Sequence, residues 1–168
     1  MRRQGAFTLI EILIVVVLLG VMAAIVIPSI SRSGTCARES ALASNLNLLR
    51  RFILVYKSHH LEVAPGYPDG NTTAAPTEAA FKAQATLASK PDGETAAVGA
   101  LGYDRGPYLS KVPANPFNQL DTIEMLANGE DFPAAGDNSH GWAYKAQTGE
   151  IRSDSTGADA GGRAYYDY

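Results

Sequence analysis

The chain is short of cysteine, of positive charge and of recognisable catalytic motifs. Its 168 residues include one cysteine, Cys36, so no disulfide can form within the chain. Lysine and arginine number 14 against 17 aspartates and glutamates, and this acidic balance argues against a nucleic-acid-binding protein, which would carry a basic surface. No phosphate-binding loop, dinucleotide fingerprint or nucleophile elbow is present. The sequence therefore does not predict a nucleotide-binding enzyme or a hydrolase of the kinds that these motifs mark.

Histidine is also scarce, and its placement does not predict a metal site. His59 and His60 are adjacent. Adjacent residues of a helix point about 100° apart, whereas a helical zinc site needs two ligands four residues apart on one face. We therefore expect both side chains to lie at a solvated helix end. His140 stands alone in a predicted loop.

The most prominent feature is an apolar run from Phe7 to Ile27 that contains one charge, Glu11. As a helix the run would be about 31 Å long, which matches the hydrocarbon thickness of a bilayer. Arg2 and Arg3 precede the run and predict a cytoplasmic start. A charge at a bilayer centre costs roughly 2.5 to 3.5 kcal/mol, and less near one end, where Glu11 lies. This carboxylate either meets a cation or snorkels to the interface.

Other amino-terminal signals fit less well. A secretory signal peptide has a shorter apolar core, and the small pair Ala23-Ala24 is followed by further apolar residues, which would bury a cleavage site. Cys36 lacks the upstream aliphatic residue of a lipoprotein signal. An ordinary signal anchor fits the length but leaves Glu11 unexplained.

The segment from Arg2 to Glu11 resembles the processing site of type IV prepilins and of type II secretion pseudopilins. The resemblance implies that a prepilin peptidase cuts between Ala6 and Phe7 and methylates the new amino group of Phe7. Glu11 then becomes the fifth residue and is implied to pair with the amino terminus of a neighbouring subunit during assembly. The family usually has Gly before the cut. This chain has Ala6, with Gly5 one place earlier, so cleavage after Gly5 is the alternative.

The same resemblance implies partners and a location. The partners are other pilin-like subunits, the prepilin peptidase, an inner-membrane assembly platform and membrane lipid, with no nucleic acid among them. The chain would cross the bacterial inner membrane once, with its amino terminus cytoplasmic and its carboxyl-terminal domain periplasmic, before it joins a filament.

The sequence predicts an α+β, pilin-like fold in which a long amino-terminal helix packs on a small antiparallel sheet with long loops. We expect a leader at residues 1–6, a membrane or filament-core helix at 7–28, its amphipathic continuation at 29–62 and a globular head at 63–168. Gly20 and Pro28 predict a kink. Six residues at spacings of three and four predict one apolar stripe that forms a wall of the core: Leu42, Leu46, Leu49, Phe52, Ile53 and Tyr56.

Within the head, Thr77 predicts the start of a short helix that ends near Ser89. Strands are expected at 121–126, 141–145 and 149–152. Their large apolar side chains are expected to pack on the stripe: Trp142, Tyr144 and Ile151. The Tyr-rich tail, 153–168, is expected either to be disordered or to pack over the sheet.

A second, weaker resemblance links residues 40–68 and the proline-rich loop 106–117 to major pseudopilins of the G class. It implies a calcium ion near the carboxyl-terminal loops, for which the candidate ligands are Asp131, Asp137, Asn138 and Asp154. Calcium needs six to eight oxygen ligands. The alternative is an acidic, solvated loop without a metal.

These observations favour a structural subunit of the pseudopilus of a type II secretion system, with a mechanical role and no catalysis. The missing cysteine pair favours this over a type IV pilin of a surface filament. The third alternative is a membrane-anchored periplasmic binding protein or enzyme that uses the segment as a tether. It would need a convergent polar site, which the sequence does not indicate.

Overall fold

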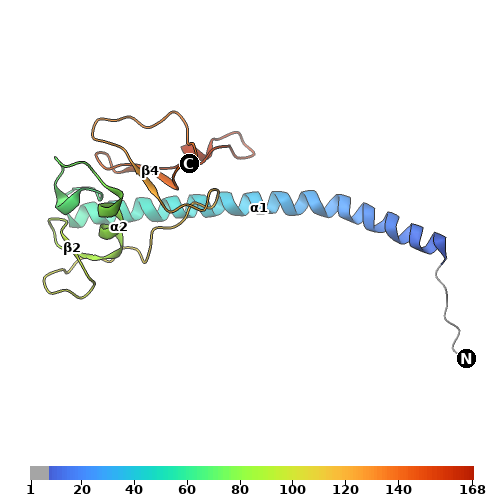
Figure 1. The fold of residues 1–168 in the computed structure, drawn as a ribbon, viewed down its shortest axis with the longest axis horizontal. Helices are drawn as coiled ribbons and strands as arrows, with labels where there is room; N and C mark the ends of the chain where they lie inside the picture. Colours follow the sequence, from blue (N-terminus) through green and yellow to red (C-terminus); the bar gives the residue numbers. More distant parts are fainter. Residues whose placement is uncertain (1–7) are drawn as a thin grey trace, which may run out of the picture. The chain divides into compact units, whose positions relative to one another are not determined.

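The computed structural model describes residues 8–168, and for residues 25–33 it describes the backbone alone. The helix α1 (Leu9–His59) is followed by the remaining helices and strands, which pack on its second half (Figure 1). Among the described residues, none of the helices combines the length and the apolar character that a membrane crossing needs. The ends of the predicted 7–28 segment fall outside the residues with described side chains, and that segment stays a prediction.

The helix α1 belongs to two units. Its described residues up to Arg38 form one, and Glu39–Tyr168 form the other. The second half of α1 is thus part of the folded head. The helix is unbroken through Gly20 and Pro28, and the kink expected at these residues stays a prediction.

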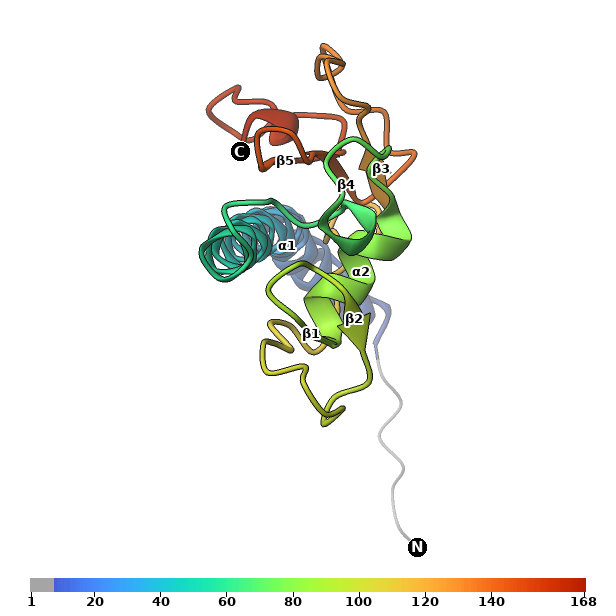
Figure 2. The same cartoon turned by 90° about the vertical axis from the view of Figure 1, so that its left-hand side faces the viewer.

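The predicted apolar stripe of α1 is the central wall of the head. All six of its side chains are buried, and they share one cluster with the three large residues of the sheet, as predicted: Leu42, Leu46, Leu49, Phe52, Ile53, Tyr56, Trp142, Tyr144 and Ile151. Figure 2 shows α2 and the strands gathered against this side of α1. Truncating one buried leucine in such a core typically costs about 2–5 kcal/mol, so the head depends on this helix for its stability.

The helix α1 ends at His59, three residues before the end expected for its amphipathic continuation at residue 62. After His59 the backbone turns sharply, because Leu61 and Glu62 adopt left-handed conformations with φ of 55° and 64°. The amide of Glu62 donates to the carbonyl oxygen of Lys57 at 3.0 Å. The chain then passes through a 3-10 turn, η1 (Pro68–Gly70), on its way to α2.

The helix α2 (Glu78–Thr86) begins as predicted and ends three residues early. The hydroxyl of Thr77 accepts a hydrogen bond from the amide of Ala80 at 3.2 Å, which is an N-cap. The expected end at Ser89 is wrong because β1 (Ala88–Ser89) pairs antiparallel with β2 (Thr95–Ala96). Strand pairing therefore takes the residues that helical propensity would have kept in the helix.

The main sheet has three strands in the order β3-β4-β5, at positions close to those predicted: β3 (Ile123–Met125), β4 (Trp142–Lys145) and β5 (Glu150–Ser153). The pair β4-β5 is an antiparallel hairpin, but β3 and β4 run parallel. The sheet is therefore mixed, where we expected it to be antiparallel throughout. The long loop between β3 and β4 makes this possible, because a parallel pair needs a crossover of a dozen or more residues.

The side chain of His60 is buried, which corrects the expectation of a solvated pair; His59 is exposed as expected. His60 stacks on Tyr56 with 3.7 Å between ring centroids. Its Nδ1 lies 2.8 Å from the carbonyl oxygen of Tyr56, and its Nε2 lies 2.9 Å from the hydroxyl of Ser89. A carbonyl can only accept, so Nδ1 carries the proton and the neutral ring accepts at Nε2. His60 thus ties the end of α1 to β1.

We predict that the head loses stability in mild acid because of His60. Desolvation lowers the pKa of His60 in the folded state below its ordinary value. The unfolded chain therefore binds more protons, so the stabilisation is complete above about pH 6.5 and is lost as pH falls from there toward the folded pKa. Thermal unfolding of the full chain, followed by fluorescence of the single tryptophan, Trp142, should show a midpoint that falls between about pH 7.5 and about pH 5.

Two substitutions distinguish the loss of stability caused by protonation of His60 from a loss caused by other groups that titrate in acid. His60→Gln removes the titrating ring and should flatten the dependence of the midpoint on pH. His59→Gln changes the exposed neighbour and should leave the wild-type dependence in place. Equal pH dependence in wild type and His60→Gln would show that the buried ring is not the responsible group.

Candidate functional site

The first turn of α1 places Glu11 beside Thr8 in a reciprocal cap. The Oε2 atom of Glu11 accepts from the backbone amide and from the hydroxyl of Thr8, both at 2.9 Å. The amide of Glu11 donates in return to the Thr8 hydroxyl at 3.3 Å. This is a capping box, which satisfies backbone donors that the first turn of a helix leaves free. The predicted assembly residue therefore has a local partner within its own chain.

Sequence reasoning missed this cap although the signal was present. A Ser or Thr followed three residues later by an acid, ahead of an apolar run, is the pattern of a capping box. The negative charge also lies in the first turn of α1, where it interacts favourably with the helix dipole. Glu11 can thus be held in place before any second chain is present.

The apolar side chains after Glu11 have no core of their own. Those with described positions between residues 12 and 22 are mostly about half exposed in the single chain: Ile12, Leu13, Ile14, Val15, Val16, Val17, Leu18, Leu19, Val21 and Met22. Soluble proteins rarely leave a continuous apolar surface of this kind in water. This half of α1 needs an apolar environment, which lipid or other helices can supply.

For the other predicted amino-terminal residues, the described part of the structure gives no side-chain contacts. Ala6 and Phe7 lie outside the described residues. Gly20 lies on α1 with open space around it, and a Cβ added there would meet no atom within 4 Å. The side chain of Pro28 also lies outside the described part. The processing, methylation and kink assigned to these positions therefore stay predictions.

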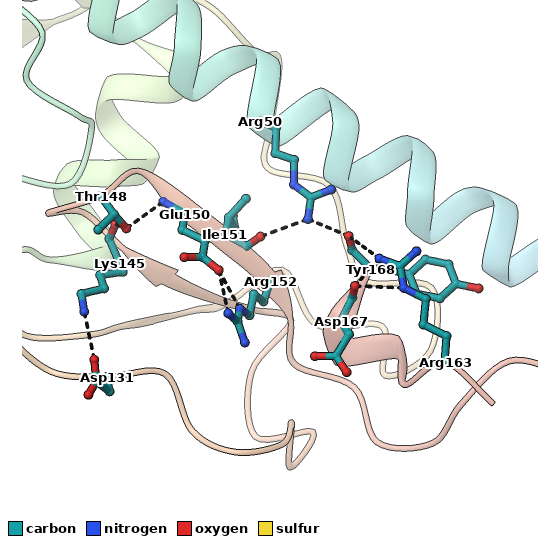
Figure 3. Close-up of polar contacts among 10 residues, drawn as sticks. All are labelled: Arg50, Asp131, Lys145, Thr148, Glu150, Ile151, Arg152, Arg163, Asp167 and Tyr168. Atoms are coloured by element: carbon teal, nitrogen blue, oxygen red, sulfur yellow. Dashed lines mark hydrogen bonds and ion pairs between the residues drawn. The ribbon is translucent and has the colours of Figure 1, made fainter.

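Three of the four calcium candidates lie together, and the fourth does not. Asp137 and Asp154 are joined by a hydrogen bond from the amide of Asp137 to Oδ1 of Asp154 at 2.8 Å. Asn138 bridges to Thr156 through its side chain. Asp131 instead pairs with Lys145 at the other end of β4, at 3.6 Å, and its side chain is fully exposed (Figure 3). The four residues do not converge on one point.

The carboxylate of Asp154 already has protein donors on both oxygens. Its Oδ1 accepts from Asp137, and its Oδ2 accepts from the amide of His140 at 2.8 Å and from the hydroxyl of Ser139 at 3.3 Å. Asp154 is buried, so these bonds satisfy a charge that would otherwise be costly. Within the described residues no group of three or more His, Cys, Asp or Glu could hold a metal ion. The hydrogen-bond donors around Asp154 therefore indicate a carboxylate that organises the loop, and they fit this role better than that of a calcium ligand.

We predict that Asp154 stabilises the head without calcium. Asp154→Asn should destabilise the fold by about 2 kcal/mol, because it weakens charge-assisted hydrogen bonds to a buried group. The matched control Asp131→Asn should cost less than about 1 kcal/mol, since it removes one exposed ion pair. In wild type, neither millimolar calcium nor a chelator should move the thermal midpoint. A calcium-dependent rise in the midpoint would contradict this account and would support the metal site that the G-class resemblance implies.

The tail packs over the sheet, which decides between the two alternatives given for it. Tyr165 and Tyr166, in the 3-10 turn η2 (Tyr165–Asp167), are buried. Figure 3 shows Arg50 reaching from α1 toward the carbonyl oxygens of Ile151, at 3.4 Å, and of Tyr168, at 2.9 Å. One basic side chain of the helix thus fastens both the hairpin and the tail.

Comparison with known proteins agrees with the amino-terminal site. Residues 1–27 match the family model of the prokaryotic N-terminal methylation motif. The matched range contains the predicted cleavage position, Glu11 and the whole apolar run from Phe7 to Ile27.

Similarity to individual proteins extends over most of the chain. The type II secretion system core protein G of Aeromonas hydrophila is 29% identical over 154 residues, which cover 86% of this chain and 96% of that protein. The protein of the same name from Klebsiella pneumoniae is 28% identical, with 84% and 96% covered, and the one from Pseudomonas aeruginosa is 28% identical, with 79% and 80% covered. No solved structure gives a significant match. The chain thus carries the N-terminal methylation motif and is similar, over most of its length, to proteins named type II secretion system core protein G.

Proposed function

We propose that this protein is a structural subunit of the pseudopilus, the filament of a type II secretion system. Two observations together support the proposal. Residues 1–27 match the methylation motif, and most of the chain aligns with proteins named type II secretion system core protein G. The role of such a subunit is mechanical. The head supplies the outer coat of the filament, and the first half of α1 supplies its core.

The membrane is the proposed environment of α1 before assembly. An apolar run of this length beside Arg2 and Arg3 favours a single inner-membrane span with the head in the periplasm. The half-exposed apolar side chains between residues 12 and 22 support the same proposal, because both lipid and neighbouring helices would cover them.

Glu11 has a defined part in the proposed assembly. In the single chain its carboxylate is occupied by the amide and hydroxyl of Thr8. Cleavage before Phe7 would create a cation one residue away from this cap, and N-methylation would keep that cation charged. A cation from a neighbouring chain can then compensate the carboxylate in apolar surroundings, where an uncompensated charge is expensive. The pairing would favour one register of docking.

Processing is predicted to remove six residues. Coexpression with a prepilin peptidase should yield a product that begins at Phe7 and carries one added methyl group, as measured by intact-mass spectrometry. A product heavier by one alanine would indicate the alternative cut after Gly5. Recovery of the uncut chain from cells that process other prepilins would contradict the proposed function.

The charge of Glu11 is predicted to be needed for assembly independently of the cap. Glu11→Gln removes the charge but keeps an acceptor that suits this capping position. Thr8→Ala removes the capping hydroxyl but keeps the charge. In cells with the assembly machinery, the first substitution should lower the amount of sheared filament by about tenfold or more, as expected when a buried charge loses its partner. The second should have a clearly smaller effect.

Two controls make this comparison decisive. Both variants should be cleaved to the wild-type extent, which shows that they reach the membrane and the peptidase. Glu11→Ala, which loses charge and cap together, should be no better than Glu11→Gln. Normal filaments from Glu11→Gln would mean that the charge is dispensable and that Glu11 acts as a helix cap alone.

A further inference from the structure

One face of α1 in the head is left without a covering element. Leu48, Leu54 and Val55 are exposed there, Leu54 by 70%. Arg51 lies three residues from Leu48 and from Leu54 and four from Val55, so these side chains are surface neighbours on the helix. We call these four residues the Leu54 face. In Figure 2 no helix or strand covers the side of α1 that points away from α2 and the sheet.

Arg51 has no partner within the described part of the chain. It is exposed and makes neither a hydrogen bond nor an ion pair there, whereas the adjacent Arg50 donates to the carbonyl oxygens of Ile151 and Tyr168. A cation surrounded by exposed apolar side chains is suited to a surface that presents a carboxylate among apolar groups.

A loop of the same chain presents that chemistry. Residues 97–104, which we call the Leu101 loop, follow β2 and carry Val98, 62% exposed, and Leu101, fully exposed. Asp104 is exposed at the end of the loop. Asp104 makes no hydrogen bond or ion pair with any described residue, and it is the loop's one charged residue.

Hydrogen bonds within and beside the Leu101 loop fix its conformation, although Leu101 at its tip is exposed. Two consecutive turns fold it, with the amide of Ala100 bonded to the carbonyl of Ala97 at 3.0 Å and the amide of Tyr103 bonded to the carbonyl of Ala100 at 3.2 Å. The Tyr103 hydroxyl donates to Glu94 at 2.7 Å, which anchors the loop beside β2. A preorganised loop loses less conformational freedom on binding, so an exposed leucine at its tip suits a docking contact.

We propose that the Leu101 loop of one copy docks on the Leu54 face of the next copy, with Asp104 paired to Arg51. The occupant is a second copy because the two surfaces match in charge and in apolar character: the charges of α1 between residues 47 and 58 are all positive, and the loop's charge is negative. The Leu54 face lies on α1 and the Leu101 loop follows β2, so the two surfaces belong to different elements. Such a contact joins unlike surfaces, so its repetition builds an open filament where the rotation between successive copies does not close a ring. This inference rests on the proposed function.

Cysteine crosslinking tests the contact in the full chain, in cells that assemble the wild-type filament. Cys36 is exposed and is first replaced by alanine. The double variant Leu54→Cys/Leu101→Cys should then form disulfide-linked ladders of dimers, trimers and longer species under mild oxidation. Neither single cysteine should form a ladder, since the contact joins different positions. Dimers from one of the single variants alone would indicate a two-fold contact and would overturn the proposal.

Charge exchange provides the second test. Arg51→Asp and Asp104→Arg should each lower the filament yield by about tenfold, as for a charge pair within an apolar contact, and the double variant should restore most of it. Lys111→Asp makes the same charge change at an exposed position outside both surfaces and should have little effect. The restored double variant also shows that neither substitution prevents folding.

The outcomes separate this inference from the proposed function. Wild-type filaments, with no disulfide ladder from the double cysteine variant and no charge rescue, would overturn the contact and leave the filament role intact. Loss of assembly in Arg51→Asp that no change at Asp104 restores would assign the Leu54 face to another protein and would also overturn it. Absence of any filament from the wild-type chain would instead contradict the proposed function.

Discussion

The head is stable only because half of a long helix belongs to its core. The stripe from Leu42 to Tyr56 packs against Trp142, Tyr144 and Ile151, and all of these side chains are buried. The strands, of two to four residues each, could not form a core by themselves, since a small isolated sheet is at best marginally stable in water. The same helix continues toward its amino terminus as an exposed apolar rod.

Polar groups fasten the head to this helix at defined points. His60 joins the end of α1 to β1, and Arg50 joins its middle to β5 and the tail. Asp154 organises the loop before β4 with a carboxylate that accepts from three donors. Such bonds add modest net stability each, but they restrict the packing to one arrangement, since a buried polar group without its partner is costly. A subunit that must repeat identically along a filament benefits from that uniqueness.

The elements that sequence predicted well are those with a strong local signal. The period of the stripe, the cap at Thr77 and the positions of the strands each follow from neighbouring residues. The parallel pairing of β3 and β4 and the burial of His60 depend on contacts between distant segments, and no local pattern encodes them. The early end of α2 has the same cause, because pairing with β2 overrides helical propensity. At the amino terminus, Thr8 and Glu11 are a local capping pattern, although the sequence-based prediction assigned Glu11 only to pairing with another chain.

Glu11 is proposed to change partners, from its own Thr8 in the single chain to the amino group of a neighbouring chain in the filament. A density map of the assembled filament at side-chain resolution tests this most directly. The account predicts a carboxylate oxygen of Glu11 within about 4 Å of the Phe7 nitrogen of another copy, the range of an ion pair. A filament in which every Glu11 still faces only its own Thr8, with the amino groups paired elsewhere, would contradict it.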